Sequence, residues 1–404
     1  MSKKQANICA VITETTVEAA RLAIQQAASE ADILEVRLDY LWGFDFTRVD
    51  NLGALLDKNS LPVIITCRAF DEGGQQKIDN SIRLPLLVEG AKKFANYCDI
   101  EAAHYHEAAK LSPDFAKLIV SYHNFEETPA NLNEIYERIT ALPAAIHKLA
   151  VRANALTDTL ATFELLQRAE TDGRTLIAIA MNEAGTLTRL LGPSHGSFLT
   201  YGSLADGKTS APGQFSCAEL KEIYRINQLT KGTKITGIIG NPVGHSVSPA
   251  MHNAAFAELN LDFVYLPIAV DDVERFFKRF VNPSSREMDW QLRGFSVTIP
   301  HKVAIMPMLD EVDQTAAKIG AVNTVVIDGE KTIGYNTDAH GAIVPLEKVS
   351  SLSEKHCAVL GAGGAARAVI YGLLEHGAGV SVFARDPQKA QRLADWRIIS
   401  AGGF

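Results

Sequence analysis

The residues Ile8-Cys9-Ala10-Val11-Ile12 and Ile33-Leu34-Glu35-Val36-Arg37-Leu38 are two short apolar runs joined by a longer segment with helical patterning. The same alternation continues to about residue 203. The eight runs are Ile8–Ile12, Ile33–Leu38, Pro62–Cys67, Tyr97–Glu101, Lys117–Tyr122, Ala145–Val151, Leu176–Met181 and Phe198–Gly202. Eight strand–helix units over about 200 residues are typical of a (β/α)8 TIM barrel, which places its chemistry at the C-terminal ends of the strands.

A new α/β alternation begins after the polar residues Lys231-Gly232-Thr233-Lys234, which follow a predicted closing helix at Ser216–Thr230. Polar, glycine-containing segments of this kind are typical of domain boundaries. We therefore predict three domains, and all three belong to the α/β class. They are a barrel at 1–229, an α/β domain at 235–341 and a partial Rossmann-type domain at 354–404.

The composition is that of an ordinary globular protein, with 47% hydrophobic and 21% charged residues. The net charge of -8 disfavours nucleic acid and anionic membranes as partners. The five cysteines lack the spacing of zinc ligands or of a disulfide framework, so we predict no metal site and a reducing compartment. The N-terminus has no signal-peptide core and no run reaches membrane-spanning length, which predicts a cytoplasmic protein. The composition does not predict the oligomeric state.

Charged residues occur inside or just after the apolar runs of the predicted barrel. Glu35, Arg37 and Arg68 are costly to bury unless paired, so they indicate either a structural ion-pair network or a polar site. Lys148 lies within the apolar run Ala145–Val151. Burial would favour its neutral amine, which is able to attack a carbonyl carbon, whereas the simpler alternative is a lysine that extends to the surface.

Five motifs occur in order along the predicted barrel. They are Glu35-x-Arg37-x-Asp39, Arg68-x3-Glu72-Gly73-Gly74, Ser121-Tyr122-His123, His147-Lys148-Leu149-Ala150 and Ser210-Ala211-Pro212-Gly213-Gln214. With them the sequence resembles type I 3-dehydroquinate dehydratase over about residues 7–226. The resemblance implies that Lys148 forms a Schiff base with the ketone of the substrate. It also implies that His123 removes the adjacent proton, and that Glu72 orients His123 and supports its charged form.

The same resemblance implies the substrate contacts. Arg189 would bind the substrate carboxylate, Ser210 and Gln214 would belong to a closing loop, and Glu35, Arg37 and Arg68 would contact hydroxyl and carboxylate groups. Met181 and Tyr201 match apolar wall positions, and a packing role is the simpler interpretation of both. Tyr201 stands where relatives often have phenylalanine.

The second region carries another set of ordered motifs. They are Gly244-His245-Ser246-Val247-Ser248-Pro249, Ser296-Val297-Thr298-Ile299-Pro300-His301-Lys302, Gly320-Ala321-Val322-Asn323-Thr324 and Asn336-Thr337-Asp338. Taken alone, the two serines could cap a helix or bind an anion, and Lys302 and Asp338 could form a surface salt bridge. In this order they resemble shikimate dehydrogenase over about residues 235–395. The resemblance implies that Lys302 and Asp338 are the catalytic pair and that Ser246, Ser248, Ser296, Thr298 and Asn323 bind the substrate.

The loop Gly361-Ala362-Gly363-Gly364-Ala365 lies between a predicted strand and a predicted helix. Glycines at such a turn let backbone amides approach a pyrophosphate at the N-terminus of the helix. Arg385, with Lys389 nearby, suits a ribose 2′-phosphate and favours NADP over NAD, although Asp386 is adjacent.

After the loop we predict two strands and two helices, which would be the adenosine half of a Rossmann fold. Shikimate dehydrogenases continue further, and we expect the chain to be truncated or frameshifted there. The sequence as a whole predicts an enzyme of the shikimate pathway that dehydrates 3-dehydroquinate, with a second domain built to reduce 3-dehydroshikimate with NADPH. One alternative is a dehydratase with a shikimate-binding module that does not turn over. An aldolase-type Schiff-base enzyme is the other, and His123 and Glu72 disfavour it.

Overall fold

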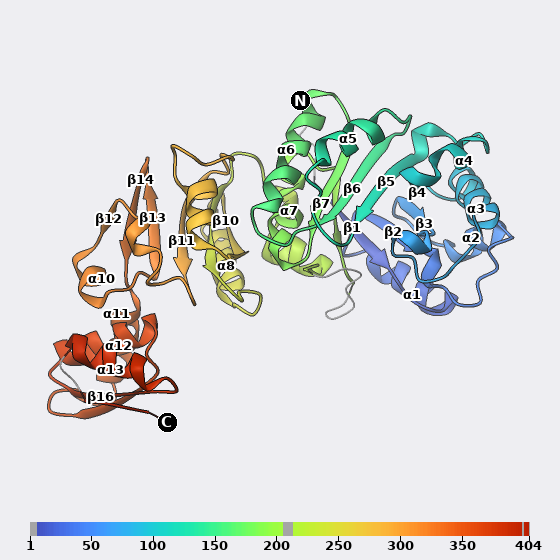
Figure 1. The fold of residues 1–404 in the computed structure, drawn as a ribbon. Coiled ribbons are helices and arrows are strands. Elements are labelled where there is room, and N and C mark those ends of the chain that lie inside the picture. Colours follow the sequence, from blue (N-terminus) through green and yellow to red (C-terminus); the bar gives the residue numbers. More distant parts are fainter. Residues whose placement is uncertain (1–5, 205–212, 398–399, 404) are drawn as a thin grey trace. The chain divides into compact units, whose positions relative to one another are not determined.

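The computed structural model describes residues 6–204, 213–397 and 400–403 (Figure 1). The chain forms two compact units, one made of residues 1–233 and 247–266, and the other of residues 234–246 and 267–404. No helix in the described part of the chain combines the length and the apolar character needed to cross a membrane. The cytoplasmic location stays a prediction from the sequence.

The first 202 residues contain eight parallel strands in the order β7-β6-β5-β4-β3-β2-β1-β8. The strands are β1 Asn7–Ile12, β2 Ile33–Arg37, β3 Val63–Thr66, β4 Tyr97–Glu101, β5 Leu118–Asn124, β6 Ile146–Arg152, β7 Leu176–Met181 and β8 Leu199–Gly202. The first and last strands of this order, β7 and β8, meet where the amide of Phe198 donates a hydrogen bond of 2.8 Å to the carbonyl of Leu176. Each predicted apolar run overlaps one strand, and the predicted (β/α)8 fold is confirmed.

Helices alternate with these strands along the chain (Figure 1). They are α1 Val17–Ala27, α2 Asp50–Leu55, α3 Asn80–Lys93, α4 Tyr105–Ala109, α5 Leu132–Thr140, α6 Asp158–Thr171 and α7 Thr186–Leu191. In α5, the buried residues Leu132, Ile135, Tyr136 and Ile139 recur every three or four positions, which is the spacing of one helix face. The amphipathic pattern therefore explains both the helix and the face that it buries.

The predicted closing helix at Ser216–Thr230 is shorter than expected. Its helical part ends with the π-helical turn Glu219–Ile223, and a separate 3-10 turn spans Ile226–Gln228. Between them Arg225 has φ 49°, a left-handed conformation that breaks a right-handed helix. The pattern of apolar residues alone did not indicate this break.

The direction of each barrel side chain follows from the two-residue period of a strand. On β6, Ile146 and Ala150 belong to the apolar cluster inside the barrel, and Lys148 lies between them in the alternation. Lys148 consequently faces the interior. His147, on the opposite face, makes a contact of 3.0 Å between Nε2 and the carbonyl oxygen of Leu142.

A second sheet has six strands in the order β10-β9-β11-β13-β14-β12. Its strands are β9 Lys234–Gly240, β10 Phe263–Ala269, β11 Leu292–Val297, β12 Glu311–Val312, β13 Thr324–Asp328 and β14 Lys331–Tyr335. The helices of this region are α8 Ser248–Glu258, α9 Val273–Phe276, α10 Gln314–Ile319 and α11 Asp338–Glu347. Parallel pairing of β9 with β11 and antiparallel pairing of β11 with β13 make the sheet mixed.

The last region is a three-stranded parallel sheet in the order β15-β16-β17. Its elements are β15 His356–Leu360, α12 Gly364–Glu375, β16 Gly379–Ala384, α13 Pro387–Arg397 and β17 Ser400–Gly403. The sequence predicted only two strands here, and the prediction missed β17. Ser400-Ala401-Gly402-Gly403 has no alternation of apolar and polar residues, and its strand is recognisable only from its pairing with β16.

Candidate active site

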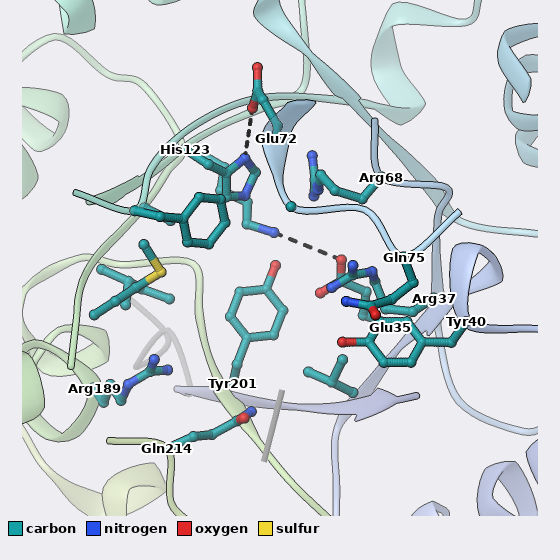
Figure 2. A pocket seen from close by; sticks show the side chains of 17 residues that line it. Glu35, Arg37, Tyr40, Arg68, Glu72, Gln75, His123, Arg189, Tyr201 and Gln214 are labelled. Atoms are coloured by element: carbon teal, nitrogen blue, oxygen red, sulfur yellow. Dashed lines mark hydrogen bonds and ion pairs between the residues drawn. The ribbon is translucent and has the colours of Figure 1, made fainter. Parts of the chain in front are cut away.

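A cavity of about 150 Å³ lies among the residues at the C-terminal ends of the barrel strands (Figure 2). It is lined by Val11, Glu35, Arg37, Tyr40, Arg68, Glu72, Gly73, Gln75, His123, Phe125, Lys148, Ala150, Ile179, Met181, Arg189, Tyr201 and Gln214. The structure thus brings together all but one of the barrel site residues predicted from the sequence. The exception, Ser210, lies outside the described residues.

Lys148 is buried at the base of this cavity, with 5% of its surface exposed. Its Nζ lies 3.0 Å from Oδ2 of Asp99 and 3.8 Å from Oε1 of Glu35, and 4.7 Å from the centre of the Tyr201 ring. It is therefore not a lysine that extends to the surface. A cation formed at this nitrogen would be stabilised by two carboxylates and by the face of an aromatic ring.

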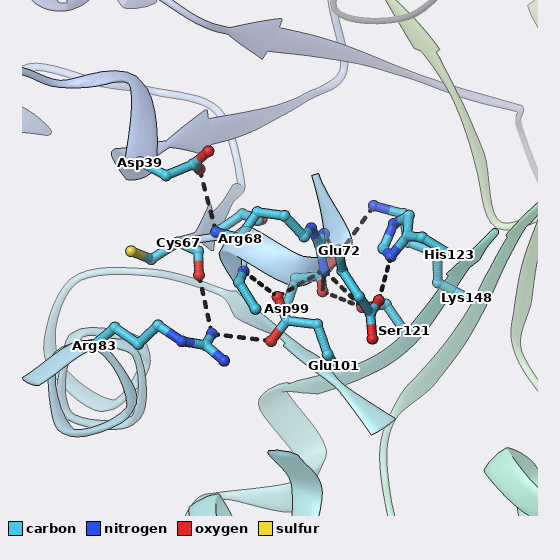
Figure 3. A network of polar contacts seen from close by, with 12 residues as sticks. Asp39, Cys67, Arg68, Glu72, Arg83, Asp99, Glu101, Ser121, His123 and Lys148 are labelled. Atoms are coloured by element: carbon cyan, nitrogen blue, oxygen red, sulfur yellow. Dashed lines mark hydrogen bonds and ion pairs between the residues drawn. The ribbon is translucent and has the colours of Figure 1, made fainter. Parts of the chain in front are cut away.

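Asp99 joins Lys148 to a buried network of ion pairs (Figure 3). Its two carboxylate oxygens each accept a hydrogen bond of 2.9 Å from the guanidinium of Arg68. Oδ1 also accepts one of 2.6 Å from the hydroxyl of Ser121. Burial would raise the pKa of the Asp99 carboxyl, but Arg68 and Lys148 hold it well below its usual range. Asp99 is therefore ionised next to Lys148.

A buried ion-pair network was one of the two expectations for Glu35, Arg37 and Arg68, but these three residues do not pair with each other. Arg37 pairs with Asp39, with the shortest N–O distance at 2.8 Å. Arg68 pairs with Asp99 and Glu101, and Oε1 of Glu35 accepts a hydrogen bond from the Thr66 hydroxyl at 2.6 Å. All three still line the cavity, so the network and the cavity wall are made of the same residues.

His123, from β5, forms a hydrogen bond of 3.0 Å between its Nδ1 and Oε2 of Glu72 (Figure 2). Glu72 ends the short 3-10 turn Phe70–Glu72, and Gly73 follows it with φ 86°. Burial and the positive charges of Arg68 and Lys148 lower the pKa of the His123 imidazole well below its ordinary value. In the free protein His123 is therefore neutral, and the charged form that Glu72 is expected to support would arise only after His123 has taken up a proton.

Arg189 lies in α7 and is 2% exposed. Among the described residues it has no carboxylate partner, and its Nε has no hydrogen-bond partner. Burial lowers the pKa of its guanidinium to about 10, so the group is still charged at neutral pH. A buried, unpaired guanidinium beside a cavity is costly unless an anion enters, which makes it a receptor for a carboxylate.

In the second unit, the Nζ of Lys302 and a carboxylate oxygen of Asp338 form an ion pair. The other oxygen of Asp338 accepts a hydrogen bond of 2.7 Å from the side-chain amide of Asn323. Asn323 also donates to Thr337 at 2.8 Å and accepts from the Thr337 amide at 3.0 Å. The predicted catalytic pair is thus formed, and Asn323 holds it in place.

The remaining predicted residues of this domain lie at the ends of secondary-structure elements. Ser296 is on β11, Thr298 directly follows that strand, and Ser248 is the first residue of α8. Ser246 lies in the turn before α8, where its amide donates to the carbonyl of Val243. Val247 is the N-cap residue of α8 and makes no side-chain capping hydrogen bond, and the substrate-binding role of the two serines stays a prediction.

The glycine loop lies between β15 and the N-terminus of α12, as the sequence predicted. Gly361 has φ 120°, and a side chain at Gly361 or Gly363 would meet no atom within 4 Å. The space over the turn is therefore open, which fits a pyrophosphate at the start of the helix. Ala362 lies between these two glycines, and Gly364 and Ala365 are the first two residues of α12.

Arg385 and Lys389 are exposed near the C-terminal end of β16. Asp386 is the adjacent acidic residue that would disfavour a phosphate. It accepts hydrogen bonds from the amides of Gln388 at 3.0 Å and Lys389 at 3.3 Å. Its carboxylate is therefore engaged in the first turn of α13, and this leaves Arg385 as the charged group that suits a phosphate.

The type I 3-dehydroquinase family model matches residues 8–231, and the model for the shikimate dehydrogenase substrate-binding domain matches residues 238–325. The chain is 35% identical to the chloroplastic bifunctional 3-dehydroquinate dehydratase/shikimate dehydrogenase of Arabidopsis thaliana, over 97% of this chain and 67% of that protein. It is 30% identical to the shikimate biosynthesis protein AroDE of Chlamydia pneumoniae, over 96% and 78%. The chain belongs to the bifunctional 3-dehydroquinate dehydratase/shikimate dehydrogenase family.

This membership confirms the predicted shikimate-pathway enzyme with a lyase domain and an oxidoreductase domain. The second half is also 45% identical to a shikimate dehydrogenase (NADP(+)) of Methanosphaera stadtmanae, over 41% of this chain and 57% of that protein. The chain thus spans little more than half the length of that dehydrogenase.

The sequence analysis missed several polar residues of the dehydratase domain, above all Asp99 and Glu101. Both lie on β4 two positions apart, within a strand that is otherwise apolar and was predicted as such. Charged residues spaced by two in an apolar strand point to the same face, so this signal was available in the sequence. The partners of these carboxylates could not be predicted from the sequence, because Arg68 is 31 residues from Asp99 along the chain.

Proposed function

We propose that the barrel domain dehydrates 3-dehydroquinate to 3-dehydroshikimate through a Schiff base on Lys148. The observation that supports this most is one cavity that holds a buried lysine amine, a neutral histidine and an arginine without a carboxylate partner among the described residues. These three groups supply a nucleophile for a ketone, a base for the adjacent C–H and a receptor for a carboxylate. A polyhydroxylated keto acid needs all three.

In the first stage the Nζ of Lys148 gives up one proton and attacks the ketone carbon as the free amine. The carbonyl oxygen takes up that proton and one more from the nitrogen, and it leaves as water to give a protonated imine. The positive charge of the imine lies at the nitrogen, where Asp99 at 3.0 Å and Glu35 at 3.8 Å stabilise it. Arg189 binds the substrate carboxylate and so orients the ring relative to Lys148.

In the second stage His123 removes a proton from the carbon next to the imine, and the neighbouring hydroxyl leaves as water. When Glu72 is ionised it can only accept a hydrogen bond, so Nδ1 of His123 then carries the hydrogen and Nε2 has the free electron pair. The Glu72 contact therefore selects the tautomer that works as a base. Hydrolysis of the imine then releases the product and Lys148.

Borohydride reduction in the presence of 3-dehydroquinate tests this assignment. We expect a stable adduct on the peptide that contains Lys148, and its loss in Lys148→Ala. Lys117→Ala is the matched control, because Lys117 is also a partly buried lysine of the barrel but its Nζ donates to the Ala91 and Ala95 carbonyls away from the cavity. An unmodified Lys148 peptide in the active wild-type protein would contradict the Schiff-base mechanism.

We further propose that the second domain reduces 3-dehydroshikimate to shikimate with NADPH. Bound at the loop 361–365, with its 2′-phosphate near Arg385 and Lys389, the cofactor would supply the hydride. Hydride transfer to the ketone leaves an alkoxide, and the Lys302 ammonium held by Asp338 can stabilise and protonate it. The product of the barrel is then the substrate of the second domain, which explains why both occur in one chain.

NADPH oxidation with 3-dehydroshikimate, followed at 340 nm, tests the second activity, with Lys302→Ala as the inactive variant. Lys331→Ala is a control, since that lysine is 67% exposed and pairs only with Glu311 on the surface among the described residues. Shikimate binding without turnover in the wild-type chain would favour the alternative of a dehydratase with a shikimate-binding module. We expect Lys302→Ala to leave the dehydratase rate unchanged.

A further inference from the structure

The phenol of Tyr201 lies in the wall of the barrel cavity. Tyr201 lies on β8 and is 7% exposed, and its hydroxyl has no hydrogen-bond partner among the described residues. In Figure 2 this hydroxyl points towards the middle of the cavity, on the side of His123. A buried hydroxyl without a partner is costly, and a packing role alone would be filled as well by phenylalanine.

The ring of Tyr201 lies beside Lys148, the proposed nucleophile. Lys148 Nζ lies 4.7 Å from the ring centre, so a substrate bonded to Nζ lies beside the ring that carries the hydroxyl. Other polar groups near this nitrogen already have partners. Asp99 is held by Arg68 and Ser121, and Glu35 accepts from Thr66.

We propose that the Tyr201 hydroxyl donates a hydrogen bond to the ketone oxygen of the substrate while Lys148 adds to the carbonyl carbon. This inference rests on the proposed Schiff-base function. When Nζ forms its bond to carbon, the electron pair of the C=O π bond moves to oxygen, and the phenol stabilises the charge that develops there. That oxygen then takes up one proton from the added nitrogen and the proton that Lys148 released before it attacked, and it leaves as water as the C=N bond forms. The phenol keeps its own proton throughout.

The phenol is suited to donate rather than to act as a base. Burial and the nearby carboxylate of Glu35 raise the pKa of the Tyr201 hydroxyl well above its ordinary value. The hydroxyl therefore stays protonated at neutral pH. The ketone oxygen leaves as water when the imine forms. A donor that binds only this oxygen therefore affects the rate of imine formation, and it does not affect the later removal of the C–H proton.

Tyr201→Phe in the full chain tests the proposal, because it keeps the ring under Lys148 and removes only the hydroxyl. We expect borohydride-trapped adduct to form about 10-fold more slowly in a single turnover, which is the effect of one lost hydrogen bond. The adduct should still form on Lys148. The deuterium isotope effect on proton removal should fall, because imine formation becomes rate-limiting. The melting temperature of the free protein should be unchanged or higher, because an unmatched buried hydroxyl has been removed.

Tyr136→Phe is the matched control. Tyr136 is also a buried tyrosine of the barrel, but its hydroxyl donates to Asp172 at 2.9 Å, and neither of these two residues lines the cavity. This variant should lose stability and keep the wild-type rate of adduct formation. Tyr201→Phe with a wild-type rate of adduct formation, or with a lowered melting temperature and an unchanged isotope effect, would overturn the proposal. If the wild type itself forms no Lys148 adduct, the proposed function fails instead.

Discussion

The Nζ of Lys148 and Oδ2 of Asp99 lie 3.0 Å apart in the interior of the barrel, 49 residues apart in the sequence. The pair connects the proposed nucleophile to Arg68 and, through Arg68, to Glu101. An ammonium buried without a counter-ion would be strongly disfavoured, so Asp99 makes it possible for this lysine to lie inside the barrel. The reactive nitrogen and the stability of the barrel therefore depend on the same carboxylate.

Asp99→Asn should destabilise the barrel by about 3 kcal/mol, because it leaves Arg68 and Lys148 without their shared partner. The pKa of Asp99 is lower in the folded than in the unfolded protein, so its contribution is present above about pH 4 and is lost as the pH falls further. Urea unfolding followed by circular dichroism should show a large difference from wild type at pH 7 and a smaller one in acid. Asp57→Asn, at an exposed position, should change stability by less than about 0.5 kcal/mol.

Glu72 should control the acid side of the dehydratase pH profile. Burial raises the pKa of its carboxyl to about 7, and below that pH the protonated carboxyl donates to Nδ1 of His123. Nε2 then carries the hydrogen and cannot act as a base. We therefore expect kcat/KM to fall as the pH is lowered through about 7. In Glu72→Gln this dependence should vanish and kcat/KM should be lower by roughly 100-fold. An unaltered acid limb in the variant would contradict the assignment.

Arg189→Met should weaken substrate binding without weakening the fold. We expect KM for 3-dehydroquinate to rise by about 10-fold to 100-fold, which corresponds to the loss of a charged hydrogen bond to the carboxylate. The melting temperature should be unchanged or higher, because the removed guanidinium is buried and has no carboxylate partner among the described residues. Arg168→Met is a surface control, since Arg168 pairs with Glu137 at 2.7 Å. A wild-type KM in Arg189→Met would rule out the carboxylate receptor.

Gly364→Ala should disturb the dehydrogenase site, whereas Gly363→Ala should not disturb the fold. A Cβ at position 364 would lie 2.8 Å from the Cβ of Lys302, and one at position 363 would meet nothing within 4 Å. Overpacking of this kind costs about 1–3 kcal/mol, and it would displace Lys302 from Asp338. Thermal unfolding and calorimetric titration with shikimate would compare the two variants. Equal shikimate affinity in both would show that Lys302 adjusts without loss.

The sequence by itself determined the elements of the fold and most of the site. The alternation of apolar runs and helical segments is a local property, so it predicted all eight barrel strands within two residues at most of their ends. The motifs around Lys148, His123 and Lys302 predicted the reacting groups, and these roles stay a prediction. Local patterns failed where a strand has no pattern, as in β17, and where a helix breaks at Arg225.

The tertiary structure alone decided how these groups are paired and charged. Ion pairs such as Arg68–Asp99 join residues that are distant in the chain, and no local pattern encodes which cation meets which carboxylate. The neutral state of His123 is likewise a property of the packed interior. So is the lack, among the described residues, of a carboxylate partner for Arg189 and of a hydrogen-bond partner for the Tyr201 hydroxyl. Burial and hydrogen-bond partners depend on every element that surrounds a side chain, and these appear only once the barrel has closed.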